Sequence, residues 1–253
     1  MYRVLKKQDL NENVTLMEVE APLVARKALP GQFIIFQKVG YTTEKLGTLK
    51  EGDALLDFVG PLGEPSRTEG IHRCAVIGGG LGVAIAYPQA RALHEAGAEV
   101  DLIVGFRNEG LIILKDELTA ACTNLTIMTD DGSNGHKGFV TQALDEKLKA
   151  GREYDTVIAI GPLPMMKAVC DMTRPFGIHT IVSMNPIMID GTGMCGGCRL
   201  TVGGETKFAC VDGPDFDGHL VDFDEAIARG RMFRPEEAKA KEKHICNLTG
   251  EAR

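Results

Sequence analysis

CAVIGGGLGVAIAYP, residues 74–88, is the stretch that decides the fold. Its first four residues are apolar and predict a buried strand, and a glycine-rich turn then leads into a helix predicted over residues 85–97. Backbone N–H groups at such a turn and at a helix N-terminus can hold a pyrophosphate. We therefore predict that a nucleotide is bound by Gly78, Gly79, Gly80 and Gly82. These glycines do not follow the G-x-G-x-x-G register, so a plain close-packed turn is an open alternative.

The alternation of buried strand and helix continues along the chain. Further strands are predicted over residues 99–106, 124–132, 154–162 and 179–185, with helices over residues 111–122, 140–151 and 163–177. Five strands joined by four helices predict a doubly wound parallel sheet, and we assign this α/β domain to residues 71–184. Ligands of such sheets bind at the carboxyl ends of the strands. The residues that follow the strands should therefore line one crevice, among them Arg107, Asp131, Gly161 and Pro162.

Residues 1–70 have a different character. Short alternating strands are predicted over residues 13–20, 32–39 and 53–60, separated by the turn sequences LPGQ, KEGD and GPLGEP. This pattern predicts a small antiparallel β-barrel or sandwich as the N-terminal domain.

The run DGTGMCGGCRLTVGGETKFAC, residues 190–210, sets four possible metal ligands at uneven spacing, D-x4-C-x2-C-x11-C. The plant-type 2Fe-2S pattern is C-x4-C-x2-C followed by a distant cysteine. We predict a 2Fe-2S cluster held by Asp190, Cys195, Cys198 and Cys210. A zinc site would need a second close ligand pair, and a redox C-x-x-C would open a helix. Both stay as weaker alternatives, as does an Asp190 that only starts the glycine turn.

Composition excludes several classes of function. The net charge of −7 argues against a nucleic-acid surface, and no apolar run is long enough to span a membrane. Seven cysteines, an odd number, argue against a disulfide framework and for the cytoplasm. The four cysteines outside the cluster motif are predicted to be core filler: Cys74, Cys122, Cys170 and Cys246. The charged segment 225–244 predicts a solvated helix interrupted at Pro235.

The order of barrel, nucleotide sheet and C-terminal cluster resembles the ferredoxin-NADP reductase superfamily. The segments VGYTTEKLGTLKEGD, VGPLGEPS, GGGLGVAIAYP, TDDGSNGHKGFVT, AIGPLPMMKAV and NPIMIDGTGMCGGC resemble more narrowly the small (alpha) subunit of NADH-dependent ferredoxin:NADP oxidoreductase, also called the sulfide dehydrogenase β subunit. In that family one aspartate and three cysteines bind the cluster. The related dihydroorotate dehydrogenase subunit uses four cysteines, so Asp190 favours the first family.

The resemblance implies a function and a set of partners. It implies an NAD-binding domain over residues 71–184, and a cluster segment with a charged tail over residues 185–253. NADH would be oxidised through FAD, and electrons would pass through the 2Fe-2S cluster to a larger, glutamate-synthase-like iron-sulfur flavoprotein, in electron bifurcation with ferredoxin and NADP. NADH is favoured over NADPH because Glu109 lies close to Arg107 and would repel a 2′-phosphate. No side chain is assigned a catalytic role.

The flavin site departs from the family pattern. Thr42 and Thr43 match a flavin-contacting stretch, but the arginine that holds the flavin in this superfamily is missing between Phe33 and Phe36, so the barrel is predicted to be shortened. FAD is still expected, because a nicotinamide delivers two electrons together and a cluster accepts one at a time. The alternatives are the same module in a hydrogenase or dihydroorotate dehydrogenase complex, and a structural or relay subunit that has lost its flavin.

Overall fold

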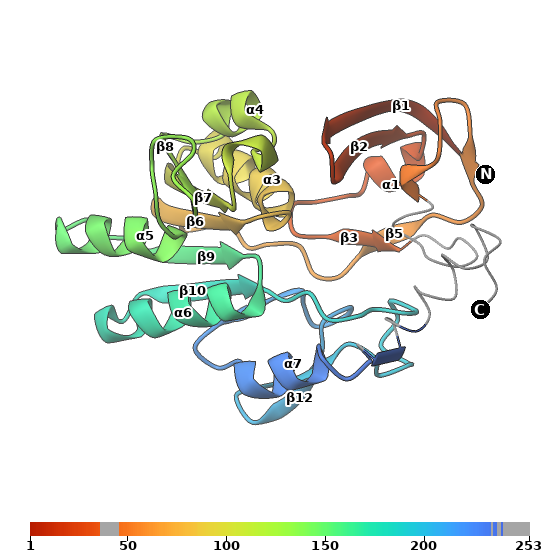
Figure 1. Ribbon diagram of the computed structural model, residues 1–253. Helices are drawn as coiled ribbons and strands as arrows, with labels where there is room; N and C mark the ends of the chain where they lie inside the picture. The colour runs from red at the N-terminus through yellow and green to blue at the C-terminus, as the bar shows by residue number, and fades with distance from the viewer. Residues whose placement is uncertain (36–45, 234, 237–238, 240–253) are drawn as a thin grey trace.

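The structure is a computed structural model that describes residues 1–35, 46–233, 235–236 and 239 (Figure 1). Its centre is a six-stranded sheet in the order β13-β10-β9-β6-β7-β8. The parallel strands are β6 (Arg73–Gly79), β7 (Glu99–Phe106), β8 (Asn124–Thr129), β9 (Thr156–Ile160) and β10 (His179–Ser183). The predicted doubly wound sheet is thus confirmed, and β13 (Asp215–Asp217) adds an antiparallel edge strand that was not predicted.

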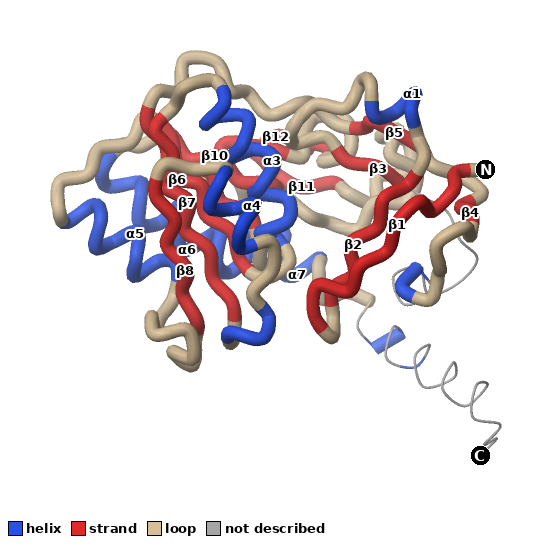
Figure 2. Tube along the Cα trace, turned by 90° about the horizontal axis from the view of Figure 1, so that it is seen from above, coloured by secondary structure: helices blue, strands red, loops and turns tan. Residues whose placement is uncertain are grey.

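Helices cover both faces of this sheet, with α3 (Gly82–Glu95) and α4 (Lys115–Ala120) on one side and α5 (Val140–Lys149) and α6 (Leu163–Thr173) on the other (Figures 1 and 2). Two short 3-10 turns, η1 (Glu109–Leu111) and η2 (Arg174–Phe176), flank α4 and α6. The helix predicted over residues 85–97 begins three residues earlier, and the one predicted over residues 111–122 shrinks to α4, because Leu114 takes a left-handed φ of 56°.

The side chains of β6 explain why this strand is central. Ala75 and Ile77 belong to the core under α5 and α6, whereas Cys74 and Val76 belong to the core under α3. Alternate residues of a strand point to opposite faces, so a continuous apolar run is buried on both. Cys122 and Cys170 are also buried in these cores, which confirms three of the four core cysteines, and Cys246 lies outside the described residues.

The N-terminal part forms two small antiparallel sheets among its described residues. β1 (Tyr2–Asn11) lies between β2 (Val14–Val19) and β4 (Ala54–Leu55), and β3 (Phe33–Ile35) pairs with β5 (Val59–Leu62). A short helix, α1 (Pro22–Ala25), lies between β2 and β3. β1 was not predicted because lysines and other polar residues fill its centre. The turn expected at GPLGEP is partly wrong, since β5 takes its first residues.

The C-terminal segment packs beside α6. β11 (Arg199–Val202) and β12 (Glu205–Phe208) form a hairpin after the glycine-rich loop, and α7 (Phe223–Arg229) contacts α6. Asp222 caps α7 by accepting a hydrogen bond from the Glu225 N–H at 2.9 Å. Of the helix predicted over residues 225–244, the structure shows α7, which ends at Arg229, and helical residues again at Pro235, Glu236 and Lys239. In the described part of the chain, no helix has both the length and the apolar character that a membrane crossing requires.

Candidate functional site

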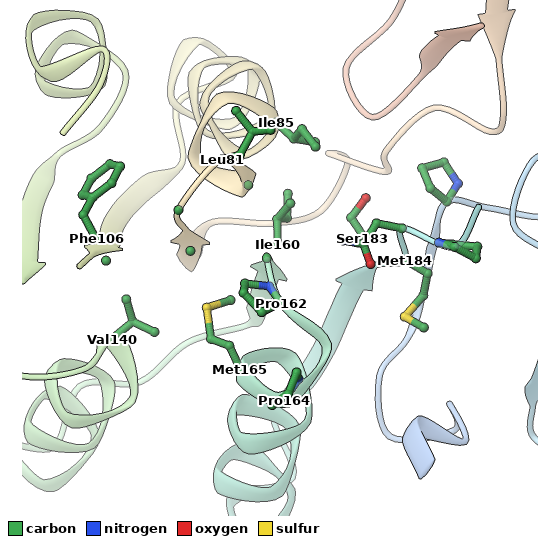
Figure 3. A pocket seen from close by; sticks show the side chains of 18 of the residues that line it. Leu81, Ile85, Phe106, Val140, Ile160, Pro162, Pro164, Met165, Ser183 and Met184 are labelled. Carbon is green, nitrogen blue, oxygen red and sulfur yellow. The ribbon is translucent and has the colours of Figure 1, made fainter. Parts of the chain in front are cut away.

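A cavity of about 1120 Å³ opens at the carboxyl edge of the large sheet (Figure 3). It lies there because the carboxyl ends of parallel strands meet at one edge. Figure 3 shows Leu81 and Ile85 from the start of α3, Pro162 and Met165 from the start of α6, and Ser183 from the end of β10 around one space. We call this space the crevice. Of the residues predicted to contact the nucleotide, it is lined by Gly79, Gly80, Gly82, Arg107, Gly161 and Pro162.

The glycine turn packs closely against its neighbours at two of its glycines and borders open space at a third. A Cβ at Gly82 would lie 2.5 Å from the Ile160 carbonyl oxygen, and one at Gly79 would lie 2.5 Å from the Met165 sulfur. Gly80 differs, because its φ is +55° and a Cβ there would meet nothing within 4 Å. The close-packed alternative therefore applies to Gly79 and Gly82, whereas Gly80 faces space that a ligand can enter.

Gly78 and Asp131 do not line the crevice, contrary to the prediction that all these strand ends would. Gly78 is buried within β6, where a Cβ would lie 2.9 Å from Val83. Asp131 turns into its own loop, and its Oδ1 accepts hydrogen bonds from the Ser133 N–H at 2.9 Å and hydroxyl at 2.7 Å. These bonds lower the pKa of Asp131. The neighbouring Asp130 lines the crevice instead.

Several lining residues were missed by sequence reasoning. Ser183 ends β10, and Met184 and Asn185 follow it, so the strand-end rule that selected the other sites would have found them. Phe139, 61% exposed, lies at the start of α5 and had no such signal. The opposite wall comes from a distant part of the chain, residues 31–35.

The crevice reaches the junction between the N-terminal sheets and the large sheet. Phe33, Ile34 and Ile35 form an apolar wall there. An apolar wall opposite a glycine turn fits a group with an aromatic ring and a pyrophosphate. Thr42 and Thr43, the predicted flavin contacts, lie outside the described residues.

The glycine-rich loop brings two of the predicted cluster ligands into contact. Cys198 and Cys210 are each 1% exposed, and their thiols lie close enough together to interact. Burial, the contact with Cys198 and the charge of Asp190 raise the pKa of Cys210 to about 11, although the Gly193 N–H acts in the opposite direction. Cys195 is exposed and accepts a hydrogen bond from the Gly197 N–H at 3.4 Å.

Asp190 organises the start of this loop. Its Oδ1 accepts a hydrogen bond from the Thr192 N–H and its Oδ2 accepts one from the Cys195 N–H, each at 2.9 Å. These bonds lower the pKa of Asp190, with the Thr192 bond the largest cause. Gly191, Gly193 and Gly196 have φ values of 75°, 81° and 65°, which let the loop turn tightly.

The four predicted ligands are not gathered into one shell. Within the described ranges, no three His, Cys, Asp or Glu side chains lie close enough together to hold a metal ion. The donor set nevertheless fits an iron-sulfur cluster in chemistry, because thiols and a carboxylate sit on one glycine-rich loop. Asp190 holds the start of the glycine turn, as the alternative interpretation of this residue predicted. A carboxylate oxygen that accepts one hydrogen bond still has a lone pair that can bind iron.

Comparisons with known proteins identify both regions. Residues 76–171 match the oxidoreductase NAD-binding domain, and residues 185–222 match the iron-sulfur cluster binding domain of dihydroorotate dehydrogenase B. A Thermotoga maritima protein named dihydroorotate dehydrogenase B (NAD(+)) electron transfer subunit homolog is 40% identical, over 96% of this chain and 95% of its own length. The chain belongs to this electron transfer subunit family. It is thus an NAD-binding oxidoreductase subunit with an iron-sulfur domain.

Solved structures show which fold this chain shares. A solved chain from the NADH-dependent reduced ferredoxin-NADP oxidoreductase, studied for flavin-based electron bifurcation, is 39% identical with a TM-score of 0.89, covering 97% of this chain and 98% of that one. This match confirms the ferredoxin-NADP reductase-like fold and the resemblance stated from the sequence. Ferredoxin-NADP+ reductase from Plasmodium falciparum, 14% identical with a TM-score of 0.55, shares the fold.

The comparisons also bear on the shortened barrel. An uncharacterised protein in the adh 3′ region of Clostridium beijerinckii is 45% identical to this electron transfer subunit, over 95% of this chain and 93% of its own length. That alignment runs over 278 positions, more than the 253 residues of this chain. The relative therefore has residues at positions where this chain has none. This agrees with the predicted loss of a chain segment.

Proposed function

We propose that this subunit binds NADH in the crevice, oxidises it with FAD, and delivers the electrons singly through a 2Fe-2S cluster to a partner protein. The observation that carries the proposal is a crevice with a glycine turn in the same chain as a cysteine loop of cluster spacing. The open space at Gly80 and the N-terminus of α3 would receive the pyrophosphate. Bound FAD would supply the exchange between two-electron and one-electron transfer.

The cluster ligands belong to this proposal. We assign the iron atoms to Asp190, Cys195, Cys198 and Cys210. Support comes from their spacing, from the contact between the Cys198 and Cys210 thiols, and from the iron-sulfur domain match over residues 185–222. We also propose domain boundaries after residues 70 and 184. β13, which belongs to the segment 185–253, completes the sheet of the domain 71–184.

We propose as partner a larger, glutamate-synthase-like iron-sulfur flavoprotein that exchanges electrons with ferredoxin and NADP. Support comes from the Thermotoga maritima relative, which is named as an electron transfer subunit homolog, and from the match to the NADH-dependent reduced ferredoxin-NADP oxidoreductase, which was studied for electron bifurcation. A cytoplasmic location stays a prediction from the free cysteines.

Two other functions each have an observation in their favour. The family model over residues 185–222 is named for dihydroorotate dehydrogenase B, which favours a role for this chain in a dihydroorotate dehydrogenase complex. The missing chain segment favours a flavin-less relay. Co-purification from native cells, with the partners identified by mass, distinguishes a dihydroorotate dehydrogenase complex from the proposed complex. The visible spectrum distinguishes a flavin-less relay from the proposed subunit.

The visible spectrum tests the proposed function directly. The purified chain is expected to show flavin bands that NADH bleaches, together with cluster absorbance. NADH should bind at least about tenfold more tightly than NADPH, because the negative charges of Glu109, close to Arg107, and of Asp130 in the crevice wall would repel a 2′-phosphate. A spectrum with cluster absorbance alone would establish the relay. Tight NADPH binding without measurable NADH affinity would contradict the assignment of the nucleotide.

Gly80→Val tests the glycine turn. The side chain would enter the space proposed for the pyrophosphate, and NADH affinity is expected to fall at least about tenfold. The left-handed φ also costs a branched residue at least about 1–2 kcal/mol of stability. Gly97→Val is the matched control, because Gly97 too has a positive φ and open space but lies at the far end of α3. Equal NADH oxidation in both variants would show that the turn is only structural.

A further inference from the structure

A buried polar cluster lies behind the crevice wall at the first residue of β13. The Oδ2 atom of Asp215 accepts hydrogen bonds from the Ser66 hydroxyl and, at 3.3 Å, from the Gln89 side-chain amide. Gln89 belongs to α3 and is 0% exposed. These three residues come from three separate parts of the chain, and none of them belongs to the proposed nucleotide or cluster contacts.

Two oxygen atoms of this cluster have no visible donor. Asp215 Oδ1 and Gln89 Oε1 are both buried without a hydrogen-bond partner among the described residues. A buried acceptor left unpaired costs about 1–3 kcal/mol. One proton on Asp215 satisfies both atoms, because its O–H can donate to Gln89 Oε1 while the Gln89 N–H donates to the other carboxyl oxygen. The result is a neutral acid-amide pair.

The surroundings of Asp215 favour the neutral acid. Burial raises its pKa, and the hydrogen bonds of Ser66 and Gln89, together with the nearby Ser183 hydroxyl, offset only part of that effect. All three of these groups are uncharged. Titratable residues on the segments that meet here include Glu64 and Arg67 beside Ser66, His94 on α3, whose Nδ1 is buried without a partner, and Asp217 on β13, which accepts a hydrogen bond from the His219 N–H at 2.9 Å.

The cluster is joined to several walls of the crevice. Ser183 ends β10 and lines the crevice. The Ser66 N–H donates to the Pro30 carbonyl at 2.8 Å, and Ser66 packs directly against Gly31, another lining residue. The carbonyl of Pro214, beside Asp215, accepts from the Met184 N–H at 2.8 Å. Asp215 therefore lies where α3, β10 and the N-terminal wall meet.

We propose that Asp215 is a positioning residue: protonated, it pairs with Gln89 and holds the crevice walls in their NADH-binding arrangement, and ionised, it loosens them. Loss of the proton would leave two acceptor oxygens facing each other. A group with a raised folded pKa contributes stability that is complete below its unfolded pKa and is lost as the pH rises through the folded pKa. The positioning role rests on the proposed function, whereas the acid-amide pair does not.

The test compares the full wild-type chain with Asp215→Asn, Asp215→Ala and the control Asp217→Asn. An infrared band of a protonated carboxyl group is expected in the wild type and absent in Asp215→Asn. As the pH rises from about 5 to about 9, wild-type NADH affinity should fall about tenfold, the loss of one buried hydrogen bond. Asp217→Asn should follow the wild type. In Asp215→Asn affinity should stay near its low-pH wild-type value, because an amide replaces the neutral acid.

Each outcome decides the proposal. A missing acid band, a pH-independent wild-type affinity, or an Asp215→Asn variant as weak as Asp215→Ala at low pH overturns it. The free energy of unfolding in urea, measured over the same pH range, should fall with rising pH in the wild type and not in Asp215→Asn. If NADH binds at no pH while the acid band and this stability difference are present, the proposed function and the positioning role fail and the acid-amide pair stands.

Discussion

Cys198→Ser is expected to remove nearly all iron from the purified chain. Cys198 is buried against Cys210, and a serine hydroxyl replaces the thiolate that iron prefers. The loss in metal affinity should exceed about 10–100-fold, which is the cost of removing a residue that only hydrogen-bonds to a metal ligand. Iron content and the paramagnetic resonance spectrum of the reduced protein measure it.

Cys170→Ser is the matched control for this loss. Cys170 is also 1% exposed, but it lies in the core under α5 and α6 and is no proposed ligand. The purified Cys170→Ser variant, in which sulfur is likewise replaced by oxygen, should keep the iron content of the wild type. If Cys198→Ser retained as much iron as Cys170→Ser, the cluster would have to be held elsewhere.

Variants of Asp190 separate its role in the turn from its role as a ligand. Asp190→Cys restores the four-cysteine pattern and should keep the cluster while shifting its reduction potential. Asp190→Asn can still accept the Thr192 hydrogen bond but loses the charge, so it should weaken the cluster if iron is bound. Full iron with an unchanged potential in Asp190→Ala would remove Asp190 from the ligand set and leave it as a turn residue.

Asp101→Ala is expected to lower the free energy of unfolding by about 3–5 kcal/mol, because it removes one of the two carboxylates paired with Arg152 and leaves the Tyr154 hydroxyl and the Asn124 amide without their acceptor. Asp101 is 1% exposed on β7. Its Oδ2 accepts from Arg152 Nε at 3.0 Å and from the Tyr154 hydroxyl at 2.6 Å, and its Oδ1 accepts from Asn124 at 2.7 Å. Urea unfolding measures the change. NADH affinity should hold, since Asp101 lies away from the carboxyl end of β7.

The exposed pair of Asp145 and Lys149 provides the control. These residues are four apart on α5, 2.6 Å from each other, and Asp145→Ala should cost only about 0.3–0.5 kcal/mol. If both variants lost the same stability, the network around Asp101 would contribute no more than a surface pair.

The cost of Asp101→Ala should depend on pH. Burial raises the pKa of Asp101, but the hydrogen bonds of Tyr154, Asn124 and Arg152 and the charge of Lys147 outweigh burial and lower it overall. A lowered folded pKa contributes stability that is present above the unfolded pKa and is lost as the pH falls through the folded pKa. The difference between wild type and Asp101→Ala should therefore shrink below about pH 4. A difference that grows in acid would contradict this sign.

The sequence by itself determined the parts of this protein that depend on neighbours along the chain. A buried run, a glycine turn and an apolar helix are local signals, so β6 and α3 were predicted, as were the parallel sheet and the edge where Gly80, Arg107 and Gly161 meet. Ligand spacing is also local, and it selected the loop that matches an iron-sulfur domain. The strand β1 was missed because lysines and other polar residues conceal its alternation.

Only the tertiary structure decided which distant segments complete the site. Three features depend on which distant segments the fold brings together. They are the crevice wall at residues 31–35, the position of Asp130 rather than Asp131 in the crevice, and the contact between Gln89 and Asp215. Gln89 and Asp215 are 126 positions apart, and neither has a local pattern that names its partner. Buried polar atoms must find donors and acceptors wherever the fold brings them. Such pairings follow from packing, which local periodicity does not specify.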